Sequence, residues 1–130
     1  MGERIVMVDS DTGLGLTEGQ LDARSAAASV RLRRRGVRAG DPVLVCLPVG
    51  PDLLVATDAV IAAGGVVWAV PPGLDTSALR RRILASRARV MISDLPQAME
   101  AADGSRVRMV VSVADLGEGG DARSREGGCR

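Results

Sequence analysis

The sequence predicts an α/β protein in which a mainly parallel sheet of about four to five strands is flanked by helices in three layers. Short apolar runs rich in Val, Leu and Ile alternate with segments of roughly 11 to 17 residues that have helical periodicity. Proline and glycine separate these segments. The chain has 130 residues, 46% hydrophobic and 25% charged, which suits one small globular domain. Such alternation is typical of parallel strands joined by right-handed crossovers.

A strand and a long helix are expected first. Residues 5–8 form an apolar run, and residues 9–15 read as a turn. Thr17 and Gln20 have the spacing of a capping box, with Thr17 as the N-cap of a helix that runs to about Arg35. The inner face of this helix is assigned to Leu21, Ala28 and Leu32. Gly36 suits the left-handed residue that follows the end of a helix.

The second strand and helix are marked by proline. Residues 43–47 form a near-continuous apolar run, which is typical of a buried parallel strand. Pro48 and Gly50 end this strand, and Pro51 suits the first position of a helix that reaches Gly64. The apolar positions of this helix recur at helical spacing: Leu53, Thr57, Val60 and Ile61.

The remaining elements are shorter. Strands are expected at residues 66–70, 90–92 and 107–111, and helices at residues 76–86 and 95–102. The apolar face of the third helix is assigned to Leu79, Ile83 and Leu84. The last residues, 117–130, are rich in Gly and charge and predict a flexible tail after a single unit over residues 1–116.

Composition excludes several kinds of chemistry. All 17 basic residues are Arg and the formal net charge is +1, so no overall field favours nucleic acid or an acidic membrane. Without His or Lys the chain lacks the usual base near neutral pH and an amine for phosphate capture. Cys46 and Cys129 are far apart in sequence and form no C-x-x-C pair, which favours a reducing compartment. No signal peptide or membrane span is evident, so we expect a cytoplasmic protein. The absence of Lys, Asn, Phe and Tyr favours a GC-rich bacterial genome.

Three glycines mimic a dinucleotide-binding loop. Gly13, Gly15 and Gly19 follow an apolar run and precede a helix, as such loops do. Their spacing is G-x-G-x-x-x-G, however, and Thr17 is better explained as a helix cap. The acidic residue that should follow the next strand is missing, because Asp41 comes before it. A β-turn is therefore the better prediction.

Structural roles are expected for the remaining candidate residues. Two arginine clusters could contact phosphate, but no aromatic residues accompany them, and we expect solvated helix ends and faces. Cys46 lies among Val and Leu and predicts a buried structural thiol. Trp68 is assigned to the core or to a sheet face. The first arginine cluster is Arg31, Arg33, Arg34, Arg35 and Arg38, and the second is Arg80, Arg81 and Arg82. Four aspartates show no metal-ligand spacing, and turn, cap and exposed-face roles are expected for them: Asp9, Asp11, Asp52 and Asp58.

Five segments in order resemble the N-terminal subdomain of the adenylate-forming family, which includes AMP-dependent acyl-CoA and aryl-CoA synthetases and peptide-synthetase adenylation domains. They are L-T-x-x-x-L-D-A-R-S from Leu16, R-x-R-G-V-R-A-G-D-P-V from Arg33, C-L-P-x-G-P-D-L from Cys46, A-V-I-A-A-G-G-V-V from Ala59 and L-A-S-R-A-R-V-M-I-S-D from Leu84. The resemblance covers roughly residues 3–112. The chain departs from the family at Glu18, Gln20, Ala26, Val49 and Pro71, where the family usually has an aromatic residue, an acid or Asn.

The resemblance implies a partial N-terminal subdomain over residues 1–116 without catalytic parts. The family binds ATP, Mg²⁺ and CoA through later motifs, including a Gly-rich loop with a Lys. We therefore expect no catalytic, cofactor-binding or metal-binding residue and no cofactor in this chain. The function expected is that of a truncated ligase-like protein that does not adenylate alone. The alternative is a non-catalytic interaction module whose apolar surface binds a second copy or a separate ligase chain. A small nucleotide-binding protein is a third possibility. Neither nucleic acid nor a membrane is expected as a partner.

Overall fold

The computed structural model describes residues 4–8, 13 and 15–116. The predicted tail, Cys129, Asp9 and Asp11 lie outside these residues. The elements in chain order are β1 (Ile5–Val8), β2 (Gly15–Thr17), α1 (Glu18–Arg34), β3 (Pro42–Val45), α2 (Pro51–Ala62), β4 (Val66–Ala69), α3 (Thr76–Ser86), β5 (Val90–Ile92), α4 (Pro96–Ala102), β6 (Met109–Val111) and α5 (Val113–Leu116).

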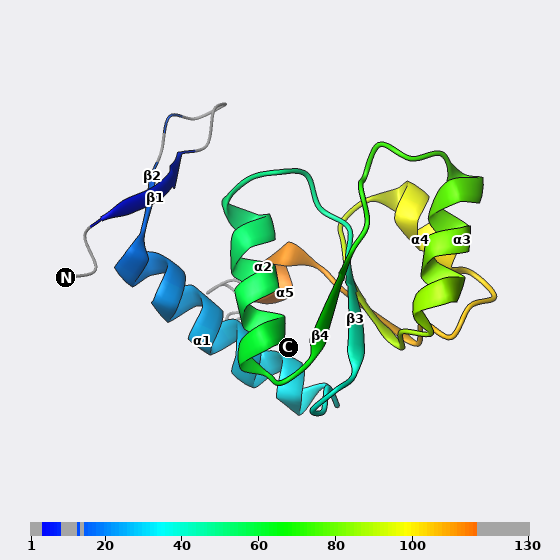
Figure 1. Cartoon of the computed structure of the whole chain (residues 1–130), viewed down its shortest axis with the longest axis horizontal. Coiled ribbons are helices and arrows are strands. Elements are labelled where there is room, and N and C mark those ends of the chain that lie inside the picture. The colour runs from blue at the N-terminus through cyan, green and yellow to red at the C-terminus, as the bar shows by residue number, and fades with distance from the viewer. Residues whose placement is uncertain (1–3, 9–12, 14, 117–130) are drawn as a thin grey trace, which may run out of the picture.

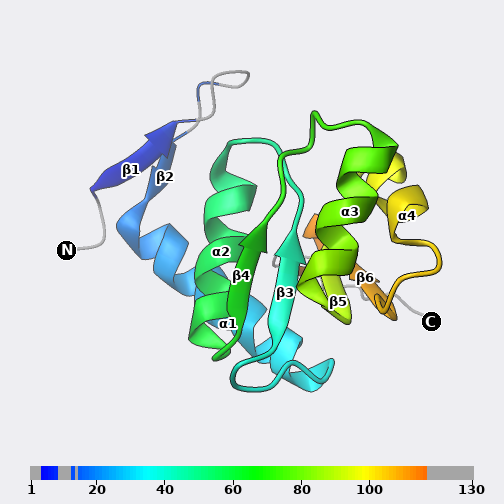
Figure 2. The same ribbon diagram turned by 45° about the vertical axis from the view of Figure 1, so that its right-hand side comes forward.

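The main sheet has four parallel strands in the order β4-β3-β5-β6. Helices α1 and α2 lie against one face of this sheet, and α3 and α4 lie against the other (Figures 1 and 2). This arrangement confirms the predicted three-layer α/β fold with a mainly parallel sheet. Three predicted strands begin or end differently, since β3 covers Pro42–Val45, β4 ends at Ala69 and β6 starts at Met109. The short helix α5 was not predicted.

The N-terminal strand is predicted correctly but does not join the main sheet. β1 pairs antiparallel with β2, and the two strands form a hairpin beside the start of α1 (Figure 1). The Glu18 N–H donates to the carbonyl of Arg4 at 2.7 Å, which continues the hairpin into the helix. β2 falls in the segment for which the sequence predicts a turn and a helix cap. A three-residue strand is too short for a clear alternating pattern.

Local signals set the ends of the first two helices. The Gln20 N–H donates to Thr17 Oγ1 at 3.1 Å and the Thr17 N–H donates to Gln20 Oε1 at 2.9 Å, which confirms the capping box. At the other end of α1, Gly36 has a φ of 102°. There the Val37 N–H donates to the carbonyl of Leu32 at 3.1 Å, as in a Schellman motif.

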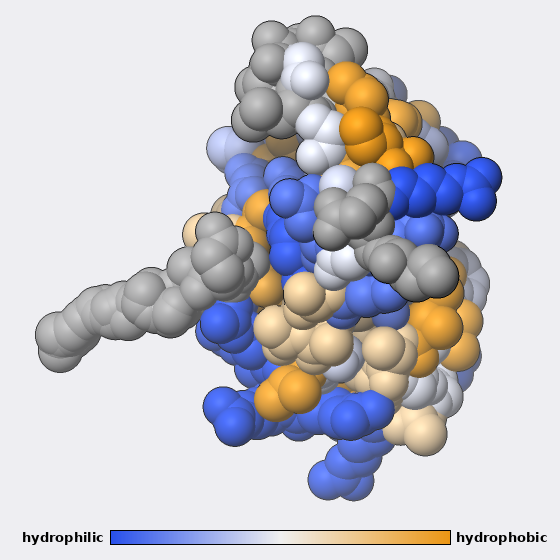
Figure 3. Space-filling view, turned by 90° about the vertical axis from the view of Figure 1, so that its left-hand side faces the viewer, coloured by the Kyte–Doolittle hydropathy of each residue, from blue (hydrophilic) through white to orange (hydrophobic). Residues whose placement is uncertain are grey.

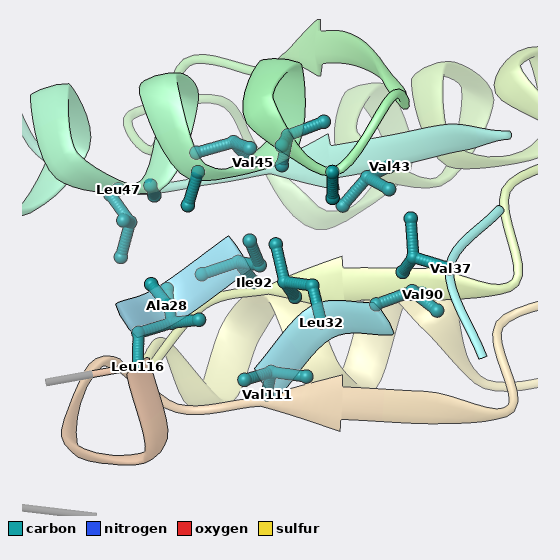
Figure 4. Packing of buried hydrophobic residues seen from close by; sticks show 14 residues of the cluster. Ala28, Leu32, Val37, Val43, Val45, Leu47, Val90, Ile92, Val111 and Leu116 are labelled. Atoms are coloured by element: carbon teal, nitrogen blue, oxygen red, sulfur yellow. The ribbon is translucent and has the colours of Figure 1, made fainter. Parts of the chain in front are cut away.

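Each face of the sheet carries its own aliphatic core. Under α1 and α2, Leu32 and Ala28 meet side chains of β3, β5 and β6 (Figure 4). Beneath α3 and α4, Leu79 and Ile83 pack with Leu44 and Met91. A chain with no Phe or Tyr therefore fills both cores with branched aliphatic residues, Ala and Met.

Two predicted core residues are exposed. Ile61 is 61% exposed and Leu84 is 52% exposed. The buried face of α2 is formed instead by Val55, Ala56, Ala59 and Val60. Helical periodicity selects a wide arc of each helix, but a four-stranded sheet covers only part of that arc. The apolar residues at the margin of each arc therefore face solvent.

Arg87 occupies a position that favours glycine. It follows α3 with a φ of 57°, and the structure describes no other non-glycine residue with positive φ. Replacing Arg87 by Gly is expected to raise the free energy of unfolding by about 1 kcal/mol, because glycine has no Cβ to strain the left-handed conformation. Chemical denaturation measures the change. The control Arg82→Gly lies inside α3 and should instead lower stability by about 1 kcal/mol; a loss in both variants contradicts the prediction.

Candidate functional site

A hollow of about 430 Å³ opens at the carboxyl ends of β3 and β5. It lies between the hairpin, the loop from β3 to α2, the loop from β5 to α4 and the start of α5. The residues that line it are mostly apolar: Met7, Val8, Leu47, Pro48, Val49, Gly50, Pro51, Asp52, Asp94, Leu95 and Val113. A hollow of this size and polarity falls within the range of small-molecule sites.

The sheet topology explains the position of the hollow. The chain moves from β3 outward to β4 and then crosses back over β3 to β5. Because both crossovers are right-handed, α2 covers one face of the sheet and α3 covers the other (Figure 2). The loops after β3 and β5 therefore diverge and leave a crevice between them. Ligands of open α/β sheets bind at this kind of switch point.

Both carboxylates at the hollow already have partners. Asp52 Oδ1 accepts from Arg24 Nη2 at 3.1 Å, which ties α2 to α1. The two oxygens of Asp94 accept from the Val113 N–H at 3.2 Å and 3.3 Å and hold the start of α5. These residues position loops. The first turn of α2 contributes N–H groups, and its N-cap Gly50 makes no side-chain cap.

The described residues do not fit a magnesium–nucleotide complex. The charged side chains that line the hollow are Asp52 and Asp94, and a triphosphate would meet negative charge there. Arg24, which pairs with Asp52, is not among the lining residues. Within the described part of the chain, no group of three His, Cys, Asp or Glu residues could hold a metal ion. We therefore derive no adenylation step from this site.

Cys46 lies buried at the end of β3 and is not placed as a nucleophile. Burial raises the pKa of the Cys46 thiol, and a hydrogen bond with Ser93 lowers it by less. A reactive thiolate requires the opposite shift. The prediction of a structural cysteine agrees with this environment.

The buried thiol predicts a pH dependence. The unfolded thiol ionises near a pKa of ~8.5, whereas the folded protein keeps Cys46 protonated to higher pH. Stability from this group is therefore complete below the unfolded pKa and decreases as the pH rises through the folded pKa. In a Cys129→Ala background, the free energy of unfolding measured in urea should fall as the pH rises above the unfolded thiol's pKa of about 8.5. The same measurement on Cys46→Ala should show a smaller fall; equal falls would contradict the assignment.

The glycines of the possible nucleotide loop are separated by the fold. Gly15 lies in β2 and Gly19 lies in α1, so the three glycines do not form a loop between a parallel strand and a helix. Trp68 lies on the edge strand β4 and is 40% exposed, so it is a sheet-face residue. Asp58 lies within α2, away from the lining of the hollow.

Several arginines of the predicted clusters hold neighbouring elements together. Arg33 Nη2 donates to the carbonyl of Ala62 at 2.7 Å, and Arg35 lies 3.8 Å from Asp115. Arg80 donates to the carbonyl of Asp103 at 2.9 Å. These contacts join helix ends to their neighbours.

The hollow is not evident from the sequence alone. The sequence feature that indicates the hollow is that Pro48 and Gly50 follow one strand and Asp94 follows another. That signal depends on strand order, because β3 and β5 are neighbours in the sheet but are separated in sequence by β4.

A model of the AMP-binding enzyme family matches residues 1–127. The chain belongs to the AMP-binding enzyme family. Among curated proteins, this family member is 39% identical over 88 residues to pyochelin synthetase PchE of Pseudomonas aeruginosa, which covers 65% of the chain and 6% of that protein. It is 32% identical over 85 residues to acetyl-coenzyme A synthetase 1 of Candida albicans, covering 65% of the chain and 13% of that protein.

The match to one bacterial relative extends further. The chain is 29% identical over 118 residues to acetyl-coenzyme A synthetase of Burkholderia mallei, which covers 88% of the chain and 17% of that enzyme. The chain thus spans less than a fifth of the length of these relatives. Its resemblance to an N-terminal segment of the AMP-binding enzymes is confirmed.

Solved structures of low sequence identity support the fold of this AMP-binding family member. The N-terminal subdomain of Klebsiella oxytoca NpsA in complex with anthranilyl-AMSN superposes with a TM-score of 0.75 at 21% identity, over 88% of the chain and 28% of that structure. The anthranilate CoA ligase AuaEII gives a TM-score of 0.79 at 16% identity, over 88% of the chain and 24% of that structure. Among the described residues, no helix has the length and apolarity needed to cross a bilayer.

Proposed function

We propose that this chain is the N-terminal scaffold of an adenylate-forming ligase module and that these 130 residues do not activate an acid by themselves. The observation that carries the proposal is the family match over residues 1–127 in a chain without Lys or His. The chemistry requires cations on the triphosphate and on the oxygens of the acyl phosphate in the transition state. ATP, Mg²⁺ and CoA would be bound mainly by other parts of the module.

Exposed apolar surface supports a scaffold role. On the hairpin, Ile5 is 59% exposed and Val8 is 56% exposed. Hydrophobic surface is visible at the hairpin, at the top of Figure 3. On the edge strand, Val66 is 49% exposed and Trp68 is 40% exposed. Apolar surface of this kind usually packs against another part of a protein or a partner. We propose that the remainder of the module covers it, whether that remainder is in the same polypeptide or in a separate ligase chain.

A segment exchange tests the scaffold role. Residues 1–116 would replace the matching segment of acetyl-coenzyme A synthetase from Burkholderia mallei, and acetate-dependent ATP–pyrophosphate exchange would be measured. The chimera should fold and retain exchange, because the catalytic parts come from the host enzyme. Trp68→Asp in the chimera should reduce exchange strongly, since Trp68 lies on the free edge. Met99→Asp, at a residue that is 43% exposed on α4, is the matched control. A folded chimera without exchange would contradict the scaffold role.

The alternative function is a non-catalytic module that self-associates through the edge strand β4. Among the described strands this one pairs with β3 alone, and its sequence VVWA contains no charged residue. Edge strands without charge or proline are prone to pair with another strand. The alternative predicts a dimer by light scattering that Trp68→Asp converts to monomer. A monomer at all concentrations would exclude it in favour of the scaffold.

We further propose a cytoplasmic protein from a GC-rich bacterium. The buried free thiol of Cys46 supports a reducing compartment. The complete use of Arg in place of Lys supports the genome composition. Neither nucleic acid nor a membrane forms part of this proposal.

A further inference from the structure

Arginines gather at the amino edge of the sheet, which is the end where the strands begin and lies opposite the hollow. Arg89 directly precedes β5 and Arg108 directly precedes β6. Arg87 and Arg106 lie two residues earlier in the same two loops, and Arg38 lies in the loop before β3. All five side chains are exposed. We call these five residues the arginine edge.

Two members of the arginine edge are level with each other. Val90 of β5 pairs with Met109 of β6, so Arg89 and Arg108 precede a matched pair. The Arg108 N–H donates to the carbonyl of Arg89 at 2.8 Å. Neighbouring strands are about 4.8 Å apart, and paired residues of a parallel sheet point to the same face. Arg89 and Arg108 therefore occupy adjacent positions just before two neighbouring strands.

The arginine edge is not neutralised within the described part of the chain. Arg87, Arg89, Arg106 and Arg108 have no ion pair or side-chain hydrogen bond there. Among the residues with described positions, Asp41 and Asp103 lie at the same edge. Asp41 Oδ2 accepts from the backbone N–H of Arg38 at 2.9 Å, and Asp103 is exposed at the end of α4.

Arg87 supplies a second observation. It keeps the left-handed conformation that glycine adopts at lower cost. Strained backbone of this kind persists only where the surrounding structure enforces it, and it is concentrated at ligand-binding and other functional sites. Arg87 caps α3, so its positive charge also suits the negative end of that helix dipole. Arg89 and Arg108 lie beyond the last turns of α3 and α4, so the helix dipoles do not explain their positions.

We propose that the arginine edge binds a small ligand that carries adjacent phosphate groups. The planar guanidinium fork of Arg matches two oxygens of a phosphate, and two arginines at adjacent positions suit two neighbouring phosphates. The one aromatic residue, Trp68, lies on β4 at the far side of β3, so no ring is available for base stacking beside the arginines. The proposal does not depend on the scaffold role, because it concerns the opposite edge of the sheet.

Calorimetric titration of the 130-residue chain with tripolyphosphate tests the proposal. The double variant Arg89→Gln, Arg108→Gln should bind about tenfold more weakly or worse, because two charge-assisted contacts are lost. The matched control Arg81→Gln, Arg82→Gln removes the same charge from the exposed face of α3 and should change the affinity less than about twofold. An equal loss in both double variants, or no saturable binding by the parent chain, would overturn the proposal.

Two further measurements distinguish a small-ligand site from a purely structural role for Arg87 and from nucleic-acid binding. Arg87→Gly should melt at a higher temperature and yet bind tripolyphosphate more weakly, which a purely structural role does not predict. If Arg87→Gly binds tripolyphosphate with unchanged affinity, Arg87 does not contribute to the site and its strained backbone has no role in binding.

Duplex DNA should bind more weakly than tripolyphosphate. Tighter binding of the duplex, with a steep salt dependence, would overturn the small-ligand proposal in favour of nucleic acid.

Discussion

Replacing Leu32 by Ala is expected to lower the free energy of unfolding by about 2–5 kcal/mol. Leu32 is fully buried at 0% exposure, and its side chain fills the space between α1, α2 and the sheet (Figure 4). Its carbonyl also accepts the Val37 N–H in the motif that ends α1. The loss is a large part of the total stability of a small domain, about 5–15 kcal/mol, so denaturation by urea should occur at a much lower concentration.

Leu84→Ala is the matched control for this substitution. Leu84 also lies in a helix, and the sequence also predicts it to be an inner-face residue, but its side chain is 52% exposed. The change in unfolding free energy should remain within about 0.5 kcal/mol. Equal losses in the two variants would contradict the described packing of α1.

Gly65→Ala is expected to lower the free energy of unfolding by about 1–3 kcal/mol through overpacking. A Cβ at this position would lie 3.1 Å from the carbonyl oxygen of Asp41 and 3.1 Å from Val60 Cγ1. The backbone cannot retreat easily, since the same Asp41 carbonyl accepts the Val66 N–H at 2.8 Å and starts the pairing of β4 with β3. Thermal and urea unfolding of the variant measure the loss.

Gly73→Ala provides the comparison for Gly65→Ala. No atom lies within 4 Å of a Cβ built on Gly73. Alanine there should be neutral or stabilise the fold by up to about 1 kcal/mol, because it restricts the unfolded chain. If Gly65→Ala is as stable as Gly73→Ala, the close approach of α2 to the loop before β3 is wrong.

Elements with strong local signals were predictable from the sequence. The capping box at Thr17 and Gln20 is a pair of contacts three residues apart, and the structure confirms it. The apolar run at residues 43–47 correctly indicated a buried central strand, β3. Such signals depend on near neighbours in the chain.

Features that depend on distant neighbours were not predictable. The exposure of Ile61 and Leu84 reflects how far the sheet extends beneath each helix, which periodicity does not reveal. The hairpin partner of β1 lies in a three-residue strand whose sequence also contains a helix cap. The hollow joins residues from β1 to α5, so its lining follows only from the strand order. The family resemblance, by contrast, was carried by five ordered segments and agrees with the match over residues 1–127.

The central claim is that these 130 residues belong to an adenylate-forming module without being able to activate an acid alone. The most direct measurement is ATP–pyrophosphate exchange by the purified chain, with Mg²⁺ and a panel of acyl and aryl acids. We predict no exchange above the level without acid for any member of the panel, even if phosphates bind at the arginine edge. Acid-dependent exchange that persists after repurification and disappears on heat unfolding would contradict the claim.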